Sequence, residues 1–153
     1  MAENDGIGHL SEVLDDRIGT HVRRIARLLI DAKAAALQPL GITVAQYSTL
    51  LSVKHLEPSS AAQLSRTGLG TPQSIATMLT TLEGKGLINR QASPIHQKLV
   101  EVRLTLLGVK TVDEADELAA GIEDDLRKAI GEELFSSIIT IERVAKALFQ
   151  EQS

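Results

Sequence analysis

In the N-terminal part of the chain, hydrophobic residues recur at steps of three and four, which predicts one long helix with a single apolar stripe. The helix should stop near Gln38, because Pro39 disfavours helical geometry in the residue before it. The stripe consists of Leu14, Ile18, Val22, Ile25, Leu29, Ala32 and Ala36.

A second apolar helical pattern occupies the C-terminal part of the chain and is interrupted by Gly131. Before this glycine the pattern comprises Leu118, Ile122, Leu126 and Ala129. After it, apolar residues follow an a/d spacing at Leu134, Ile138, Ile141, Ala145 and Leu148. Such terminal helices either face the core of their own chain or pack against a second copy of it, and the pattern favours the second copy.

Three shorter helices are predicted between the two long ones, and each begins at a capping signal. Thr43–Gln46 and Ser60–Gln63 fit the capping box, in which a hydroxyl and an amide satisfy the N–H groups at a helix start. Thr71 can cap a third helix, with Pro72 at its first position. The predicted helices cover residues 43–55, 60–66 and 71–84, with Gly68 and Gly70 in the turn between the last two.

Two strands are predicted next, over residues 87–91 and 98–104, with a loop at 92–97 and a further helix capped by Thr105. Three short helices followed by a hairpin are typical of a winged helix-turn-helix, which places its last helix in the major groove of DNA. We therefore expect a mainly α fold with a small β-hairpin wing, flanked by long N- and C-terminal dimerisation helices. The expected division is 1–40 (dimerisation helix), 41–105 (winged helix-turn-helix) and 106–153 (dimerisation helices).

Charge is distributed unevenly along the 153 residues, whose formal net charge is −4. Residues 42–105 contain six basic and three acidic side chains, whereas residues 106–153 contain five basic and eleven acidic ones. A basic middle segment in an acidic chain favours an anionic partner for that segment, such as double-stranded DNA.

The composition excludes several other classes of protein. Without cysteine the chain can form no disulfide, thiolate metal site or thiol redox switch. One Tyr, two Phe and no Trp argue against a base-stacking platform. There is no apolar run long enough for a membrane span and no signal-peptide pattern at the N-terminus, so we expect a soluble, cytoplasmic protein.

Candidate catalytic and metal sites are also missing from the sequence. No two histidines lie four residues apart on one helix, and no Gly-Xaa-Ser-Xaa-Gly motif is present. Gly68-Leu-Gly70 lacks the third glycine of a dinucleotide site. We therefore expect no enzyme activity, no metal and no cofactor. The basic side chains Arg23, Arg24 and Arg27 either pair with acidic residues, which we favour, or touch DNA phosphates.

Four segments in order resemble the MarR family of transcriptional regulators. They are Leu40-Gly-Ile-Thr43, Ala62-Gln-Leu-Ser65, Leu82-Glu-Gly-Lys-Gly-Leu-Ile-Asn-Arg90 and Val102-Arg-Leu-Thr-Leu-Leu-Gly108. The resemblance implies a homodimer whose terminal helices interlock and whose winged domains grip a pseudo-palindromic operator. It also implies a small lipophilic or phenolic effector that releases the DNA. The expected function is a ligand-responsive DNA-binding regulator, with a repressor favoured.

The DNA contacts are expected from the helix at 71–84 and from the wing. Thr71 and Ser74 are expected at a phosphate, and Gln73 and Thr77 at base edges, where glutamine can read adenine. The full set of candidates is Thr71, Gln73, Ser74, Thr77, Thr81, Arg90, His96 and Lys98. For the effector, the sequence offers only Tyr47 and His21, in a cleft between the first helix and the helix that contains Tyr47.

The sequence departs from the family where DNA contact matters. Residues 71–84 contain no basic side chain, and the wing has His96-Gln97-Lys98 where the family tends to have an acidic residue followed by arginines. This departure keeps a second interpretation open, in which the chain is a dimeric winged-helix module used mainly for protein–protein contacts.

Overall fold

The computed structural model describes residues 10, 13–94 and 100–150 and is mainly helical with a single hairpin, which confirms the predicted fold class. Its elements are helices α2 (Ile18–Leu37), α3 (Val44–Leu56), α4 (Ala61–Ser65) and α5 (Pro72–Gly84), strands β1 (Ile88–Ala92) and β2 (Val100–Leu104), and helix α6 (Leu106–Gln150). A 3-10 turn, η1 (Gln38–Leu40), joins α2 to α3.

The three short helices begin at the capping residues that the sequence predicted. The Thr43 and Ser60 hydroxyls each accept a hydrogen bond from the N–H three residues later, and the side-chain oxygen of the glutamine at that position accepts one from the N–H of the cap residue, so both capping boxes form. Thr71 accepts from the N–H of Ser74, and Pro72 occupies the first turn of α5. Local side-chain chemistry therefore determines where each of these helices starts.

The winged unit closes its own hydrophobic core. Strands β1 and β2 pair antiparallel, from Ile88 opposite Leu104 to Ala92 opposite Val100. Helices α3, α4 and α5, the hairpin and the beginning of α6 all contribute fully buried side chains to one cluster, among them Leu50, Val53, Leu64, Leu79, Leu82, Val102 and Val112. This core fixes α5 relative to the hairpin, and so it positions the helix expected to read DNA.

The first long helix begins at Ile18, not at Leu14 as the apolar stripe predicted. Residues 13–15 form a separate helical turn, and Arg17 then adopts an extended conformation with φ −104° and ψ 122°. The spacing of apolar residues continues across this break. The apolar pattern could not reveal the break, because spacing does not report the backbone angles of the connecting residue. The helix ends at Leu37, as expected from Pro39.

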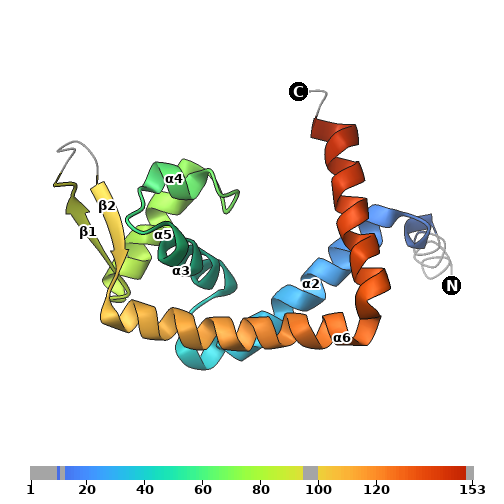
Figure 1. Cartoon of the computed structure of the whole chain (residues 1–153), viewed down its shortest axis with the longest axis horizontal. Coiled ribbons are helices and arrows are strands. Elements are labelled where there is room, and N and C mark those ends of the chain that lie inside the picture. The colour runs from blue at the N-terminus through green and yellow to red at the C-terminus, as the bar shows by residue number, and fades with distance from the viewer. Residues whose placement is uncertain (1–9, 11–12, 95–99, 151–153) are drawn as a thin grey trace, which may run out of the picture.

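The apolar faces of α2 and of the last part of α6 are not covered by their own chain. Within α2 only Thr20 and Leu37 are buried, whereas Ile18 is 74% exposed and Leu28 70%. In α6 the backbone breaks at Gly131, where φ is 77°, and the segment beyond it turns away from the first one, as Figure 1 shows. Leu134, Ile138, Ile141 and Leu148 of this segment are each 50–57% exposed. These stripes do not belong to the core of a single chain.

Within the residues that the structure describes, no single helix is both long and apolar enough to cross a membrane. Only the pair Ile18–Leu40 and Val44–Leu56, bent by 77°, passes that test on length and composition together.

The junction between the wing and α6 depends on a close approach of two backbones. Thr105 donates from its N–H to the carbonyl of Leu87 at 3.0 Å and from its hydroxyl to the carbonyl of Gly86 at 2.7 Å. Gly108 donates to the Thr105 hydroxyl at 2.9 Å, as expected for a helix cap. A Cβ atom on Gly108 would lie 1.9 Å from the Leu87 carbonyl oxygen, so only glycine fits there.

We expect Gly108→Ala to lower the free energy of unfolding by about 3 kcal/mol, because the new methyl group meets backbone that cannot rotate away. Gly121→Ala is the matched control, since nothing lies within 4 Å of a Cβ on that exposed helical glycine. Removing the helical penalty of glycine there should raise stability by about 0.5–1 kcal/mol. Urea unfolding of both variants measures the difference, and equal stabilities would contradict the role assigned to the junction.

Candidate DNA-binding interface

Helix α5 presents one apolar and one polar face. Ile75, Leu79 and Leu82 are buried against the core. The opposite face is exposed and includes four of the predicted contact residues, namely Gln73, Ser74, Thr77 and Thr81. The structure therefore brings these side chains together on the accessible side of the helix expected to enter the major groove.

The hydroxyl groups at the start of α5 are engaged within its first turn. Thr71 donates to the Ser74 hydroxyl at 3.2 Å, and Ser74 donates to the Thr71 carbonyl at 2.8 Å. The N–H of Ser74 donates a hydrogen bond to the Thr71 hydroxyl oxygen. A phosphate bound at this turn would compete with these bonds, so the predicted phosphate contact of Thr71 and Ser74 stays a prediction.

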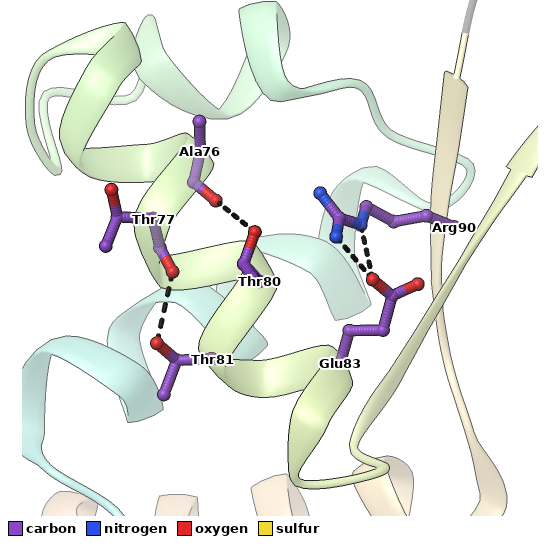
Figure 2. A network of polar contacts seen from close by, with 6 residues as sticks. All are labelled: Ala76, Thr77, Thr80, Thr81, Glu83 and Arg90. Carbon is purple, nitrogen blue, oxygen red and sulfur yellow. Dashed lines mark hydrogen bonds and ion pairs between the residues drawn. The ribbon is translucent and has the colours of Figure 1, made fainter.

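Arg90 reaches from β1 back to the end of α5. Both its Nε and one terminal nitrogen donate to Oε2 of Glu83, the former at 2.8 Å (Figure 2). The hydrogen bond from Arg90 holds the pKa of the Glu83 carboxyl below its ordinary value. The sequence suggested Arg90 as a positive charge that contacts DNA. Its charge is partly neutralised by Glu83, and the sequence did not reveal this ion pair.

Other basic side chains of the middle segment are also engaged. Lys54 pairs with Asp113 at 2.7 Å and Arg103 with Glu101 at 2.9 Å. Lys85 donates to the carbonyl oxygen of Gly41 at 2.6 Å. The pKa of Glu101 is lowered by a hydrogen bond from Ser93 and then by Arg103.

Arg66 is exposed and, unlike Lys54, Arg90 and Arg103, forms no ion pair with any other described residue. It is the C-cap residue of α4 and precedes the turn into α5. The sequence analysis counted Arg66 among the basic residues but did not select it as a DNA contact. Its position just before the turn of the helix-turn-helix could have indicated such a contact. The wing candidates His96 and Lys98 lie outside the described residues.

The two effector candidates lie in different places. The Tyr47 side chain is only 8% exposed, and its hydroxyl donates to Asp116 on α6 at 2.7 Å. Burial, and secondarily this bond, raises the pKa of Tyr47 well above its ordinary value, so the phenol is neutral. His21 instead lies on α2, where its ring contacts the carbonyl of Asp15 at 2.7 Å.

Cavities along α2 open toward α6, whereas the sequence had suggested a cleft between α2 and α3. One cavity of about 230 Å³ is lined by Ile25, Leu28, Leu29, Ile122 and Leu126. A second, of about 420 Å³, contains His21 and extends to Ile138 and Ile141. Both linings are almost wholly aliphatic and come from α2 and α6. The cleft expected between α2 and α3 stays a prediction.

The surface beside these cavities is basic. Arg23, Arg24 and Arg27 line a shallow hollow next to Leu28. Arg24 pairs with Asp15 at 2.5 Å and Arg27 with Asp31 at 2.8 Å, as the salt-bridge interpretation predicted for these two residues. Within the part of the chain that the structure describes, no three His, Asp or Glu side chains gather in a way that could hold a metal ion.

Comparison with known proteins gives a consistent result. The MarR family model matches residues 42–100. An HTH-type transcriptional repressor of Mycobacterium tuberculosis is 32% identical over 94 residues, which are 61% of this chain and 68% of the repressor. The repressor CouR bound to a 23-mer DNA duplex is 26% identical with a TM-score of 0.76, over 90% of this chain and 95% of that one. CouR bound to p-coumaroyl-CoA is 25% identical with a TM-score of 0.75, over 89% and 94%.

Glu83→Gln should free Arg90 for a phosphate. We expect the affinity for random-sequence duplex to rise and the slope of log affinity against log salt to steepen by about one for each Arg90 that reaches the DNA. Glu132→Gln is the matched control, because it breaks the Arg127–Glu132 pair of 2.9 Å on α6, remote from α5. A salt titration by fluorescence anisotropy measures both, and identical slopes for the two variants would show that Arg90 does not reach DNA.

Proposed function

The chain belongs to the MarR family, and we propose that it is a transcriptional repressor that binds operator DNA as a homodimer and releases it when a small effector binds. The observation that supports this most directly is α5, a capped helix whose buried face is locked into a closed core and whose polar face is exposed. Gln73 and Thr77 read base edges from that face. Arg66, with His96 and Lys98 of the wing, supplies charge to the phosphates.

The dimer forms through α2 and the segment of α6 beyond Gly131. Both have apolar stripes that their own chain leaves open, and a groove of about 420 Å³ runs between them. A second copy related by a two-fold axis buries these stripes and sets the two α5 helices about 34 Å apart, one turn of DNA. Residues 1–40 and 106–153 thus act as dimerisation segments around the DNA-binding unit at 41–105, and the protein acts in the cytoplasm.

The effector is a lipophilic molecule with an acidic or phenolic group. The aliphatic cavity between α2 and α6 suits its apolar part, and Arg23 beside Leu28 suits an anionic group. A relative that binds p-coumaroyl-CoA, a phenolic thioester, supports this class of ligand. Binding between α2 and α6 lowers DNA affinity only if the ligand prefers a dimer whose α5 helices are misplaced for the operator.

Gln73→Ala and Lys98→Ala should separate reading of sequence from binding of phosphate. The first should cost about 1–3 kcal/mol at one base pair in each half-site and leave binding to random DNA intact. The second should weaken binding to all duplexes alike and flatten the salt slope by about one. Competition binding with an operator selected from genomic fragments, and with random duplex, measures both effects.

Equal losses on operator and random DNA for Gln73→Ala would show that α5 does not read bases. That outcome would favour the alternative in which the winged unit contacts proteins.

Ile141→Glu should dissociate the dimer, because a charge placed in the apolar groove cannot be buried without a partner. Ile141 is 54% exposed in the single chain and lines the groove against α2. Arg143→Gln makes the same change in net charge on the opposite face of the helix and should leave the dimer intact. Analytical ultracentrifugation at micromolar concentration distinguishes the two, and a monomeric wild-type chain would contradict the proposed assembly.

A further inference from the structure

The exposed face of α5 is rich in methyl groups and has no positive charge. Ala76, Thr77, Thr80 and Thr81 are all exposed, and residues 71–84 contain no lysine or arginine. On a helical period these four side chains fall on one side, together with Gln73 and opposite the buried Ile75, Leu79 and Leu82. A major-groove surface of this kind offers apolar contacts to bases, whereas an arginine would offer hydrogen-bond donors to them.

The hydroxyl protons of the three threonines are already engaged. Thr77 donates to the carbonyl of Gln73, Thr80 to that of Ala76 and Thr81 to that of Thr77, each at 3.1 Å; Figure 2 shows the last two bonds. These bonds fix the side-chain rotamers, so that each threonine offers a methyl group and oxygen lone pairs, but no donor. The lone pairs accept from adenine and cytosine amino groups alike, so they do not discriminate between the two.

Arg90, the arginine at the end of this helix, is also engaged. Arg90 donates twice to Glu83 at the end of α5, on the side of the helix that Figure 2 shows turned toward β1. Guanine presents only acceptors in the major groove, and its usual partner is an arginine or lysine that donates to both of them. Cytosine is read by a free carboxylate, whereas the Glu83 carboxylate is occupied.

We propose that α5 selects half-sites of A·T pairs, with thymine methyl groups packed against Thr77 and its neighbours Ala76 and Thr80, and adenine read by Gln73. Thymine is the one base with a methyl group in the major groove, and alanine and threonine methyl groups are its ordinary apolar contacts. An amide such as that of Gln73 matches the N6 and N7 positions of adenine. This inference rests on the proposed function, since it specifies which operator the repressor reads.

The first arm of the test finds the sequence that the full-length chain selects from duplexes with a random core of about two helical turns. We expect two A·T-rich half-sites one helical turn apart. The second arm replaces the thymines of that site by deoxyuracil, one at a time, which removes only the methyl group. At a contacted thymine the loss should be about fourfold per half-site and about 15-fold when both half-sites are changed. Thymines outside the half-sites serve as controls.

The third arm tests whether the thymine methyl group contacts Thr77, by combining Thr77 variants with uracil-substituted DNA. Thr77→Ser removes the methyl of Thr77 and keeps its hydroxyl, so the penalty of uracil at the contacted position should fall, with Ala76 and Thr80 retaining the remainder. Thr77→Val keeps a methyl and loses the hydroxyl, so the penalty should remain. Because the uracil arm alters only the DNA, its result stands even if a variant proves unstable.

The outcomes separate the inference from the function on which it rests. Selected half-sites that contain guanine opposite α5, with binding lost on replacement by 7-deazaguanine, would overturn the inference while leaving a sequence-specific repressor. The same holds if no thymine shows a uracil penalty, or if Thr77→Ser retains it in full. Failure to enrich any sequence over random duplex would overturn the proposed function itself, and the inference with it.

Discussion

The apolar faces of α2 and of the last segment of α6 cannot be buried within one chain, and this constraint organises the molecule. The winged unit has a closed core, with Leu50, Leu79 and Leu82 fully or almost fully inaccessible. The long helices, by contrast, expose Ile18, Leu28 and Phe149 by 70% or more. Apolar surface of this extent is unfavourable in water and typical of an interface. Association therefore completes the fold, and it is also what places two reading helices on one operator.

The connection from this interface to the DNA runs through α6. At its beginning, Thr105 and Gly108 hold the helix against the backbone of Leu87 at the base of the wing. Further along, Asp113 and Asp116 accept hydrogen bonds from Lys54 and Tyr47 of α3, each at 2.7 Å. The first segment of α6 thus moves with the winged unit as one body. In the function that we propose, a ligand bound between α2 and α6 acts by changing the distance between the two α5 helices, with no need to deform the winged unit itself.

Most of the local structure could be predicted from the sequence because its signals are local. Thr43, Ser60 and Thr71 begin helices through bonds to residues three positions later, and Gly131 breaks α6 through its own backbone angles. The break at Arg17 could not be predicted in this way, since Arg17 forms no side-chain cap and the apolar spacing continues across it.

The chemistry of the interface was less accessible to sequence reasoning. Gln73, Ser74, Thr77 and Thr81, which the sequence predicted as DNA contacts, are exposed on α5. The sequence pattern could not reveal that Arg90 is held by Glu83, because that contact depends on how β1 packs beside the end of α5. Nor could it show that apolar side chains of α2 line a cavity together with α6. Pairings across elements depend on the assembled fold, whereas periodicity describes one element at a time.

The distribution of charge gives a physical reason for a reading helix without basic residues. Phosphate contacts contribute affinity for every sequence, whereas contacts to base edges contribute only at the operator. Here several cations of the middle segment are paired internally, as at Lys54, Arg90 and Arg103, and eleven acidic residues lie beyond residue 105. We therefore expect binding to random DNA to be weak. A dimer that binds two half-sites at once multiplies the contributions of its base contacts to the affinity. The dimer can therefore discriminate the operator from random DNA although each α5 face has little affinity for DNA in general.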